Sequence, residues 1–117
     1  MTDNKPKHAW VYMLECTDSQ GKKSIYTGMT TDIERRMVEH RESCNWGAGA
    51  RASQYMRAQE DFVHIWTSDE LPSVRMASKM EKHIKQMIKD RKYALASGDI
   101  KEVERLSRWL AQARFSW

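Results

Sequence analysis

The sequence predicts an α+β fold, in which a small three-stranded sheet made of a β-hairpin and one further strand is flanked by helices. Two segments rich in β-branched and aromatic residues flank a polar turn near the N-terminus, and a third such segment covers residues 61–67. The remaining segments repeat apolar residues with a helical period. The predicted element order is β-β-α-β-α-α.

Length and composition indicate one compact domain. The chain has 117 residues, of which 40% are hydrophobic and 31% are charged, and this is the size of a single folding unit. Its longest apolar run, residues 9–14, is far shorter than the ~20 residues of a membrane helix, so we expect no membrane partner. The first residues lack the apolar core of a secretory signal, and two cysteines are too few for a disulfide scaffold. We therefore expect a cytoplasmic protein with reduced thiols.

The hairpin is predicted from residues 8–16 and 24–30, which flank a polar turn at residues 17–21. A loop centred on Ser19 places Tyr12 directly opposite Tyr26, with Cβ atoms about 5 Å apart. Gly28 follows on the same face and leaves space where a ligand or a second backbone can approach. Aromatic pairs across strands are also ordinary packing, so the pair alone leaves both interpretations open.

After the hairpin, the spacing of the apolar residues changes from that of a strand to that of a helix. Thr31 or Asp32 can cap a helix that runs to about Ser43. Arg36 and His40 are four residues apart and therefore cover one patch of this helix, as site residues or as plain surface residues. Residues 44–58 predict an ordered loop or short helix. The apolar stripe of the helix consists of Ile33, Met37 and His40.

One long helix is predicted from about residue 73 to residue 96, after Pro72. Glu81 falls on its apolar stripe, where a carboxylate must be paired, bind a metal or lie at the rim of a cleft. An ordinary ion pair with a nearby lysine or arginine is the simpler alternative. The stripe consists of Val74, Ala77, Glu81, Ile84 and Ile88, with Met80 and Met87 at its margins.

A last helix is predicted after the stop at residues 97–99, with helical spacing of Ile100, Val103, Leu106 and Leu110. The predicted organisation is therefore an N-terminal tail at 1–8, a domain at 9–92 and a helical extension at 93–117 that packs on the domain. The alternative is an exposed anchor for a protein partner or a second copy of the chain. The aromatic residues concerned are Trp109, Phe115 and Trp117.

Charge is unevenly distributed along the chain, whose net charge is +4. Residues 58–71 hold four acidic residues and no lysine or arginine, whereas residues 72–92 hold seven basic residues against two acidic ones. A strongly basic segment indicates a polyanionic partner, and nucleic acid is the commonest. A solvated helix face is the alternative. The histidines and cysteines do not form a zinc pattern.

Several of these residues together resemble the GIY-YIG nuclease superfamily, and especially its small single-domain members, over about residues 9–92. The resemblance rests on V11-Y12-M13, Y26-T27-G28, R36, H40 and E81 in this order, and on the segments TTDIERRMVEH and ASKMEKHIKQM. The sequence departs from the family where VYM stands for GIY, and where no asparagine follows Glu81. The resemblance implies that Tyr12 and Tyr26 are paired active-site tyrosines and that Gly28 allows a close approach to the chain beside them. It also implies that Arg36 is the phosphate-binding arginine, His40 the helix histidine and Glu81 the metal ligand.

The resemblance therefore implies an endonuclease that hydrolyses DNA, guided by DNA structure more than by sequence. Glu81 would hold Mg²⁺ or Mn²⁺ through one carboxylate, and the Arg36 fork would bind phosphate. Tyr12 would be the general base. A phenol titrates near 10, so a phenolate at pH 7 costs roughly 4 kcal/mol, which predicts an alkaline optimum.

Further nucleic-acid contacts are expected from residues around this centre, and RNA is a possible substrate beside DNA. Two alternatives stay open: a nucleic-acid-binding module of the same fold that does not cleave without a partner, and a protein-interaction domain that uses the C-terminal aromatic residues. Salt-sensitive binding would separate the nucleic-acid functions from the last one. The expected contact residues are Gly28, Arg51, Tyr55, Arg57, Lys79 and Lys82.

Overall fold

The computed structural model describes residues 8–43 and 59–114. It confirms the α+β class and the three-stranded antiparallel sheet, and it adds one helix to the predicted order. The elements are β1 (Trp10–Asp18), β2 (Lys23–Thr30), α1 (Ile33–Ser43), β3 (Gln59–Thr67), α3 (Val74–Lys85), α4 (Lys89–Ala96) and α5 (Ile100–Arg114). No helix in these described ranges is long and apolar enough to cross a membrane.

The strand order is β2-β1-β3, with β1 in the centre. Tyr12 lies opposite Gly28 and Leu14 lies opposite Tyr26, so the predicted direct pairing of Tyr12 with Tyr26 is wrong. The turn is centred at residue 20, one residue later than expected, because the Asp18 carboxylate accepts backbone hydrogen bonds from Gln20 and Lys22, both at 2.9 Å, and this moves every cross-strand partner by two residues. A shift of two residues keeps both tyrosines on one face of the sheet.

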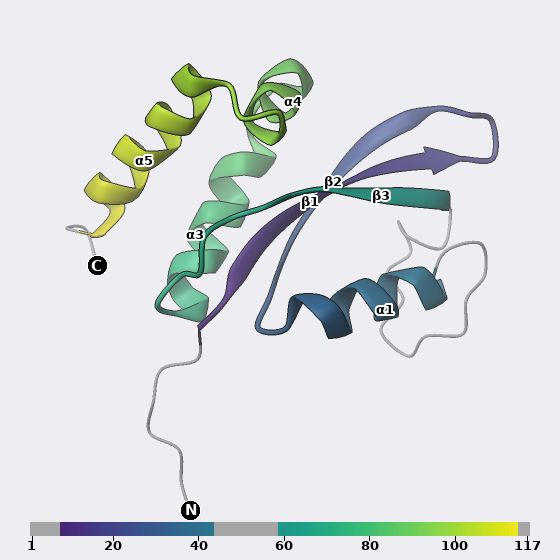
Figure 1. Ribbon diagram of the computed structural model, residues 1–117, viewed down its shortest axis with the longest axis horizontal. Coiled ribbons are helices and arrows are strands. Elements are labelled where there is room, and N and C mark those ends of the chain that lie inside the picture. Colours follow the sequence, from purple (N-terminus) through teal and green to yellow (C-terminus); the bar gives the residue numbers. More distant parts are fainter. Residues whose placement is uncertain (1–7, 44–58, 115–117) are drawn as a thin grey trace, which may run out of the picture.

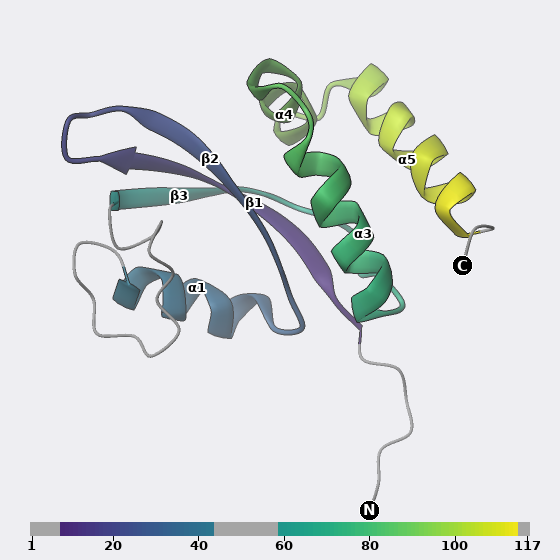
Figure 2. The same cartoon turned by 180° about the vertical axis from the view of Figure 1, so that it is seen from behind.

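Helices cover both faces of the sheet. Figures 1 and 2 show α1 on one side of the strands and α3, α4 and α5 on the other. The α1 face carries a cluster of Tyr12, Leu14, Cys16 and Phe62, against which Tyr26, Ile33 and Met37 pack. The α3 face carries the main core, built on Val11 and Met13 of β1 and on Met76, Ala77, Met80 and Ile84 of α3.

The predicted single helix over residues 73–96 is wrong, because the chain turns between α3 and α4. Ile88 has an extended backbone, with φ −66° and ψ 157°, and α4 begins at the next residue. The turn lets α4 bring Leu95 back onto the main core. The predicted stripe is also displaced: Met76 and Met80 are buried, whereas Val74 is 39% exposed and Ile88 is 66% exposed.

Helix α5 packs outside α3. Leu106, Trp109 and Leu110 contact the main core, and the Trp109 ring stacks on His83 with a centroid distance of 4.4 Å. Ile100 and Val103, expected on the inner side of this helix, are exposed. Phe115 and Trp117 lie outside the described residues.

Candidate active site

Helix α1 is positioned so that its second and third turns reach the hairpin. The Asp32 carboxylate accepts a hydrogen bond from the Arg35 backbone N–H at 3.0 Å and caps the helix, as the sequence predicts. Ile33 and Met37 pack against the sheet. Arg36 and His40 share this side of the helix and meet Tyr12 of β1.

The Tyr12 hydroxyl is the centre of the cluster. Its oxygen lies 2.6 Å from His40 Nε2, and Arg36 Nε donates a hydrogen bond to it at 3.3 Å. A guanidinium can only donate, so the Tyr12 oxygen accepts that bond and its own proton is free to be donated to His40. This network assigns the His40 proton to Nδ1. Tyr12 is fully buried and His40 is 2% exposed.

Burial makes both partners of this hydrogen bond neutral. It raises the pKa of Tyr12 above the usual range of a phenol, and the opposing hydrogen bond from Arg36 does not cancel the effect. Burial also lowers the pKa of His40 to about 4, and the positive charge of Arg36 acts in the same direction. Near pH 7 the site therefore holds a phenol hydrogen-bonded to a neutral imidazole, beside a guanidinium cation.

Gly28 provides the space that the two tyrosine rings occupy. The Tyr12 and Tyr26 centroids are 6.3 Å apart, and the Tyr26 ring lies edge-on to His40 at 5.2 Å. A Cβ atom on Gly28 would lie 2.5 Å from the Tyr12 hydroxyl oxygen and 3.0 Å from Cε2 of Tyr26. Any other residue would push the tyrosines out of place. Glycine is therefore needed at this position because the two tyrosine rings approach its backbone closely.

An open polar hollow of about 330 Å³ lies beside this cluster, between the end of β2 and the first turns of α1. Arg36 is one of its walls and donates a hydrogen bond to the Glu39 carboxylate at 2.9 Å. Glu39 was not among the residues predicted from the sequence, although its spacing of three residues from Arg36 on a helix is a usable signal. The lining residues are Met29, Thr30, Thr31, Arg35, Arg36 and Glu39.

Glu81 is not part of the Tyr12 cluster, because α3 lies on the other face of the sheet. His83 and Lys79 face α5, and a rotation of about 100° per residue places Glu81 on the opposite flank of α3, away from α5. Its nearest charged partner is Lys85, with an N–O distance of 3.7 Å, and its side chain is 19% exposed.

The chemistry of this carboxylate fits a magnesium site of the water-rich kind. Mg²⁺ keeps several waters and commonly takes only one or two protein carboxylates, and Glu81 offers one half-buried carboxylate in a long ion pair. In the part of the chain that the structure describes, no group of three histidine, cysteine or acidic residues could hold a metal. Glu81 stays the predicted metal ligand.

The expected nucleic-acid contacts are only partly placed. Lys79 and Lys82 lie on α3, where Lys82 is exposed and Lys79 lines a hollow beside Trp109. Both are therefore on the face of the sheet that does not carry Tyr12. Arg51, Tyr55 and Arg57 lie outside the described residues.

Comparison with known proteins agrees with the resemblance seen in the sequence. Residues 8–94 match the GIY-YIG catalytic domain, which is generally an endonuclease domain. The chain is 30% identical over 93 residues to a UPF0213 protein of Vibrio cholerae, covering 80% of this chain and 81% of that one. It is 38% identical over 88 residues to a UPF0213 protein of Haloquadratum walsbyi, covering 74% and 84%.

A solved structure is also similar. The solution NMR structure of a UPF0213 protein from Bacillus halodurans is 31% identical to this chain, covers 86% of it and 97% of its own length, and gives a TM-score of 0.42. Together with the match over residues 8–94, the relatives confirm the family expected from Tyr12, Tyr26, Gly28, Arg36 and His40. The match over residues 8–94 and the sequence relatives show that the chain belongs to the GIY-YIG domain family, among its small single-domain UPF0213 proteins.

Proposed function

We propose that the protein is a metal-dependent endonuclease that hydrolyses phosphodiester bonds in DNA. The observation that carries this proposal is the buried Tyr12 hydroxyl, held between the neutral imidazole of His40 and the guanidinium of Arg36. A phosphodiester needs a group that accepts the proton of the attacking water and a cation that stabilises the phosphate oxygens. The cluster offers one of each, side by side.

Tyr12 and His40 move the proton together. The Tyr12 oxygen accepts the proton of the attacking water, while the Tyr12 proton passes to Nε2 of His40 over the 2.6 Å hydrogen bond. The phenol is neutral before and after the step, so the roughly 4 kcal/mol cost of a free phenolate at pH 7 is replaced by a cost of about 4 kcal/mol for protonating His40, whose pKa is about 4. His40 ends the step as a cation and releases the proton to solvent, which its low pKa favours.

Arg36 is the phosphate-binding group. Its Nε is used by Tyr12 and one Nη by Glu39, which leaves further N–H donors of the planar fork for the oxygens of a phosphate in the adjoining hollow. Arg35 lines the same hollow with a half-exposed side chain. The two guanidinium groups share the single Glu39 carboxylate, which leaves this hollow with a net positive charge that favours a polyanionic substrate.

Glu81 is proposed to hold Mg²⁺ or Mn²⁺. The metal would supply Lewis-acid stabilisation of the leaving 3′ oxygen. What supports Glu81 is the position of α3 against β2, the edge strand that carries Tyr26 and Gly28. The flank of α3 that carries Glu81 faces away from α5. A substrate that lies across the edge of the sheet at β2 would therefore contact both faces of the sheet, the one with Tyr12 and the one covered by α3.

The test is cleavage of labelled duplex, nicked, flapped, branched and single-stranded DNA with Mg²⁺ or Mn²⁺ and with EDTA, repeated on RNA. Glu81→Gln should abolish cleavage while DNA binding survives. Glu104→Gln is the matched control, because it removes the same charge from an exposed position on α5, and it should cleave at the unchanged rate. Cleavage that persists in EDTA, or equally in Glu81→Gln, would contradict the proposed metal role.

A nucleic-acid-binding module without its own catalysis is the second candidate. The position of Glu81 on the far face of the sheet from Tyr12 favours it, as does the absence of an asparagine after Glu81. Under this function the protein binds DNA with a steep salt dependence and cleaves none of the substrates above with either metal.

A further inference from the structure

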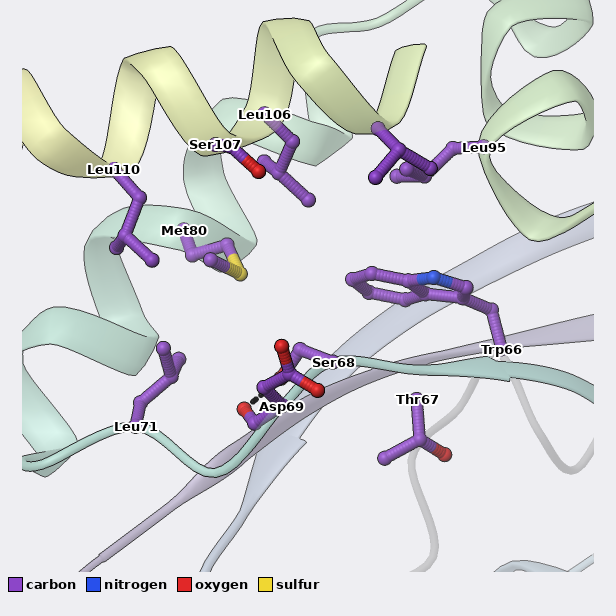
Figure 3. Close-up of a pocket in the computed structure, with 11 residues that line it drawn as sticks. Trp66, Thr67, Ser68, Asp69, Leu71, Met80, Leu95, Leu106, Ser107 and Leu110 are labelled. Atoms are coloured by element: carbon purple, nitrogen blue, oxygen red, sulfur yellow. Dashed lines mark hydrogen bonds between the residues drawn. The ribbon is translucent and has the colours of Figure 1, made fainter. Parts of the chain in front are cut away.

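A second pocket, which the proposed cleavage does not use, lies on the α3 face of the sheet. It has a volume of about 230 Å³ and opens between the end of β3, α3 and α5 (Figure 3). Tyr12 and its partners are on the other face of the sheet, so a ligand here would not compete with DNA for Arg36. The apolar walls consist of Leu71, Met80, Leu95, Val103, Leu106 and Leu110.

Two other side chains give this apolar pocket its chemical character. Figure 3 shows the Trp66 ring and the Asp69 carboxylate pointing into the space enclosed by the leucines. Within residues 8–43 and 59–114, the Asp69 carboxylate makes no hydrogen bond or ion pair, whereas that of its neighbour Glu70 pairs with His8. The Asp69 side chain is exposed, so the pocket combines an aromatic wall with a solvated negative charge at its rim that has no protein partner in these ranges.

The Asp69 carboxylate is presented by a backbone that is fixed on both sides. Ser68 exchanges hydrogen bonds with Val11: its backbone N–H donates to the Val11 carbonyl at 2.8 Å and its hydroxyl accepts from the Val11 N–H at 3.0 Å. Leu71 pairs with Ala9 through two backbone hydrogen bonds of 2.8 and 3.1 Å. Such preorganisation lowers the entropic cost of binding at Asp69.

The charge of the pocket lining favours a cation over an anion. Asp69 is the one charged side chain among the residues that line the pocket, so its carboxylate would attract a cation and repel a phosphate. A positive group beside a tryptophan ring and a carboxylate gains both a cation–π contact and a charge-assisted hydrogen bond. The apolar walls require that this group carry a hydrocarbon stem.

We propose that this pocket binds an alkylammonium group, with the ammonium between Asp69 and the Trp66 ring and the stem against the leucines of α5. The volume is below the roughly 300 Å³ at which pockets for drug-sized ligands begin, so the ligand is small, with a stem of a few carbons. A free amine and a lysine side chain of another protein share this chemistry. The proposal does not depend on the proposed nuclease function.

The test compares two probes of the same shape, n-hexylammonium and n-hexanol, by the NMR shift of the Trp66 indole N–H, assigned with Trp66→Phe. The ammonium should shift the Trp66 signal saturably, and hexanol should bind at least tenfold more weakly. Asp69→Asn should weaken the ammonium at least tenfold. Glu70→Gln is the matched control, because it removes an equal charge outside the pocket lining, and it should bind as the unaltered protein does.

Ser107→Leu tests the location without touching a charge. Ser107 lines the pocket from the exposed side of α5, so a leucine there would occupy the space and abolish binding while the remaining amide signals stay in place. N-acetyl-lysine methylamide separates the two sources: if it binds as well, the ligand is a side chain of a partner, and if only hexylammonium binds, it is a free amine.

Three results would overturn the proposal. The first is a Trp66 signal that does not move with hexylammonium at tens of millimolar. The second is that hexanol binds as tightly as hexylammonium, and the third is that Asp69→Asn binds hexylammonium as tightly as the unaltered protein does. The second and third would make the pocket a plain apolar cavity. None of these readouts uses DNA, so a failure here is distinct from a failure of the nuclease function.

Discussion

Gly28→Ala adds only one methyl group, but it should disturb the candidate site strongly. The new Cβ would lie 2.5 Å from the Tyr12 hydroxyl oxygen and 2.7 Å from its Cζ, whereas an ordinary Cβ contact is 3.4 Å or longer. The hydroxyl must therefore move by about 0.9 Å, against hydrogen bonds to His40 and Arg36. Tyr12 is fully buried, so its ring has no free space to retreat into.

Two effects follow from this displacement. Overpacking of a well-packed site costs about 1–3 kcal/mol of unfolding free energy, which a urea titration measures through its midpoint and slope. A misplacement of about 1 Å in a reacting group costs on the order of 10²-fold in rate, which a single-turnover cleavage assay with Mg²⁺ measures. DNA binding should be unchanged, because Arg36 keeps its exposed donors.

The control is a double-mutant cycle with Tyr12→Phe, which removes the atom closest to the new methyl group. Because the worst contact disappears, Gly28→Ala should cost at least about 0.5 kcal/mol less in the phenylalanine background than alone. A Gly28→Ala protein with unaltered stability and cleavage rate, or a strictly additive cycle, would refute the reasoning that Gly28 exists to seat Tyr12.

Three further predictions concern protonation and the C-terminal helix. Burial holds the pKa of His40 at about 4 against its ordinary 6.5. Between these two pH values the unfolded chain takes up a proton that the folded chain does not. The free energy of unfolding should therefore fall as the pH is lowered from 6.5 to 4, by up to about 1.4 kcal/mol per pH unit. Burial lowers the pKa of His83 as well, which makes stability fall with pH in the same direction. In urea titrations at several pH values, the unfolding free energy of His40→Gln and of His83→Gln should each depend less steeply on pH than that of the unaltered protein. An unchanged pH dependence in either variant would contradict the burial effect on that histidine. The cleavage rate should be flat between pH 6 and 9 if Tyr12 passes its proton to His40, whereas the free phenolate expected from the sequence requires a rise toward alkaline pH. Trp109→Ala should lower the unfolding free energy by about 2 kcal/mol through lost burial and stacking, and an unchanged urea midpoint would mean that α5 does not stabilise the domain.

The sequence predicted the face of the candidate active-site residues better than their register. Side chains alternate with a period of two along a strand, so Tyr12, Tyr26 and Gly28 share a face in either register. The two-residue shift depends on the Asp18 carboxylate, which fixes the turn through hydrogen bonds to Gln20 and Lys22. A pattern of apolar residues does not report such a local bond.

The helical part was predicted less well, for two physical reasons. No glycine or proline stands between α3 and α4, and the extended backbone of Ile88 reflects the packing of Leu95 on the core, which overrides local propensity. The stripe drawn through Glu81 missed Met76 and placed Met80 only at its margin, although both residues are buried in the core. The Asp69 pocket is not visible without the packing of distant elements, whereas the spacing of Arg36 and Glu39 on α1 could have indicated their ion pair.

The most direct test of the account is the single-turnover cleavage rate of labelled DNA with Mg²⁺ by the unaltered protein and by Tyr12→Phe, which differ by one oxygen atom. The account predicts a loss of at least about 10²-fold in rate with unchanged DNA affinity. Equal rates for the two proteins would contradict the central role of the Tyr12 hydroxyl.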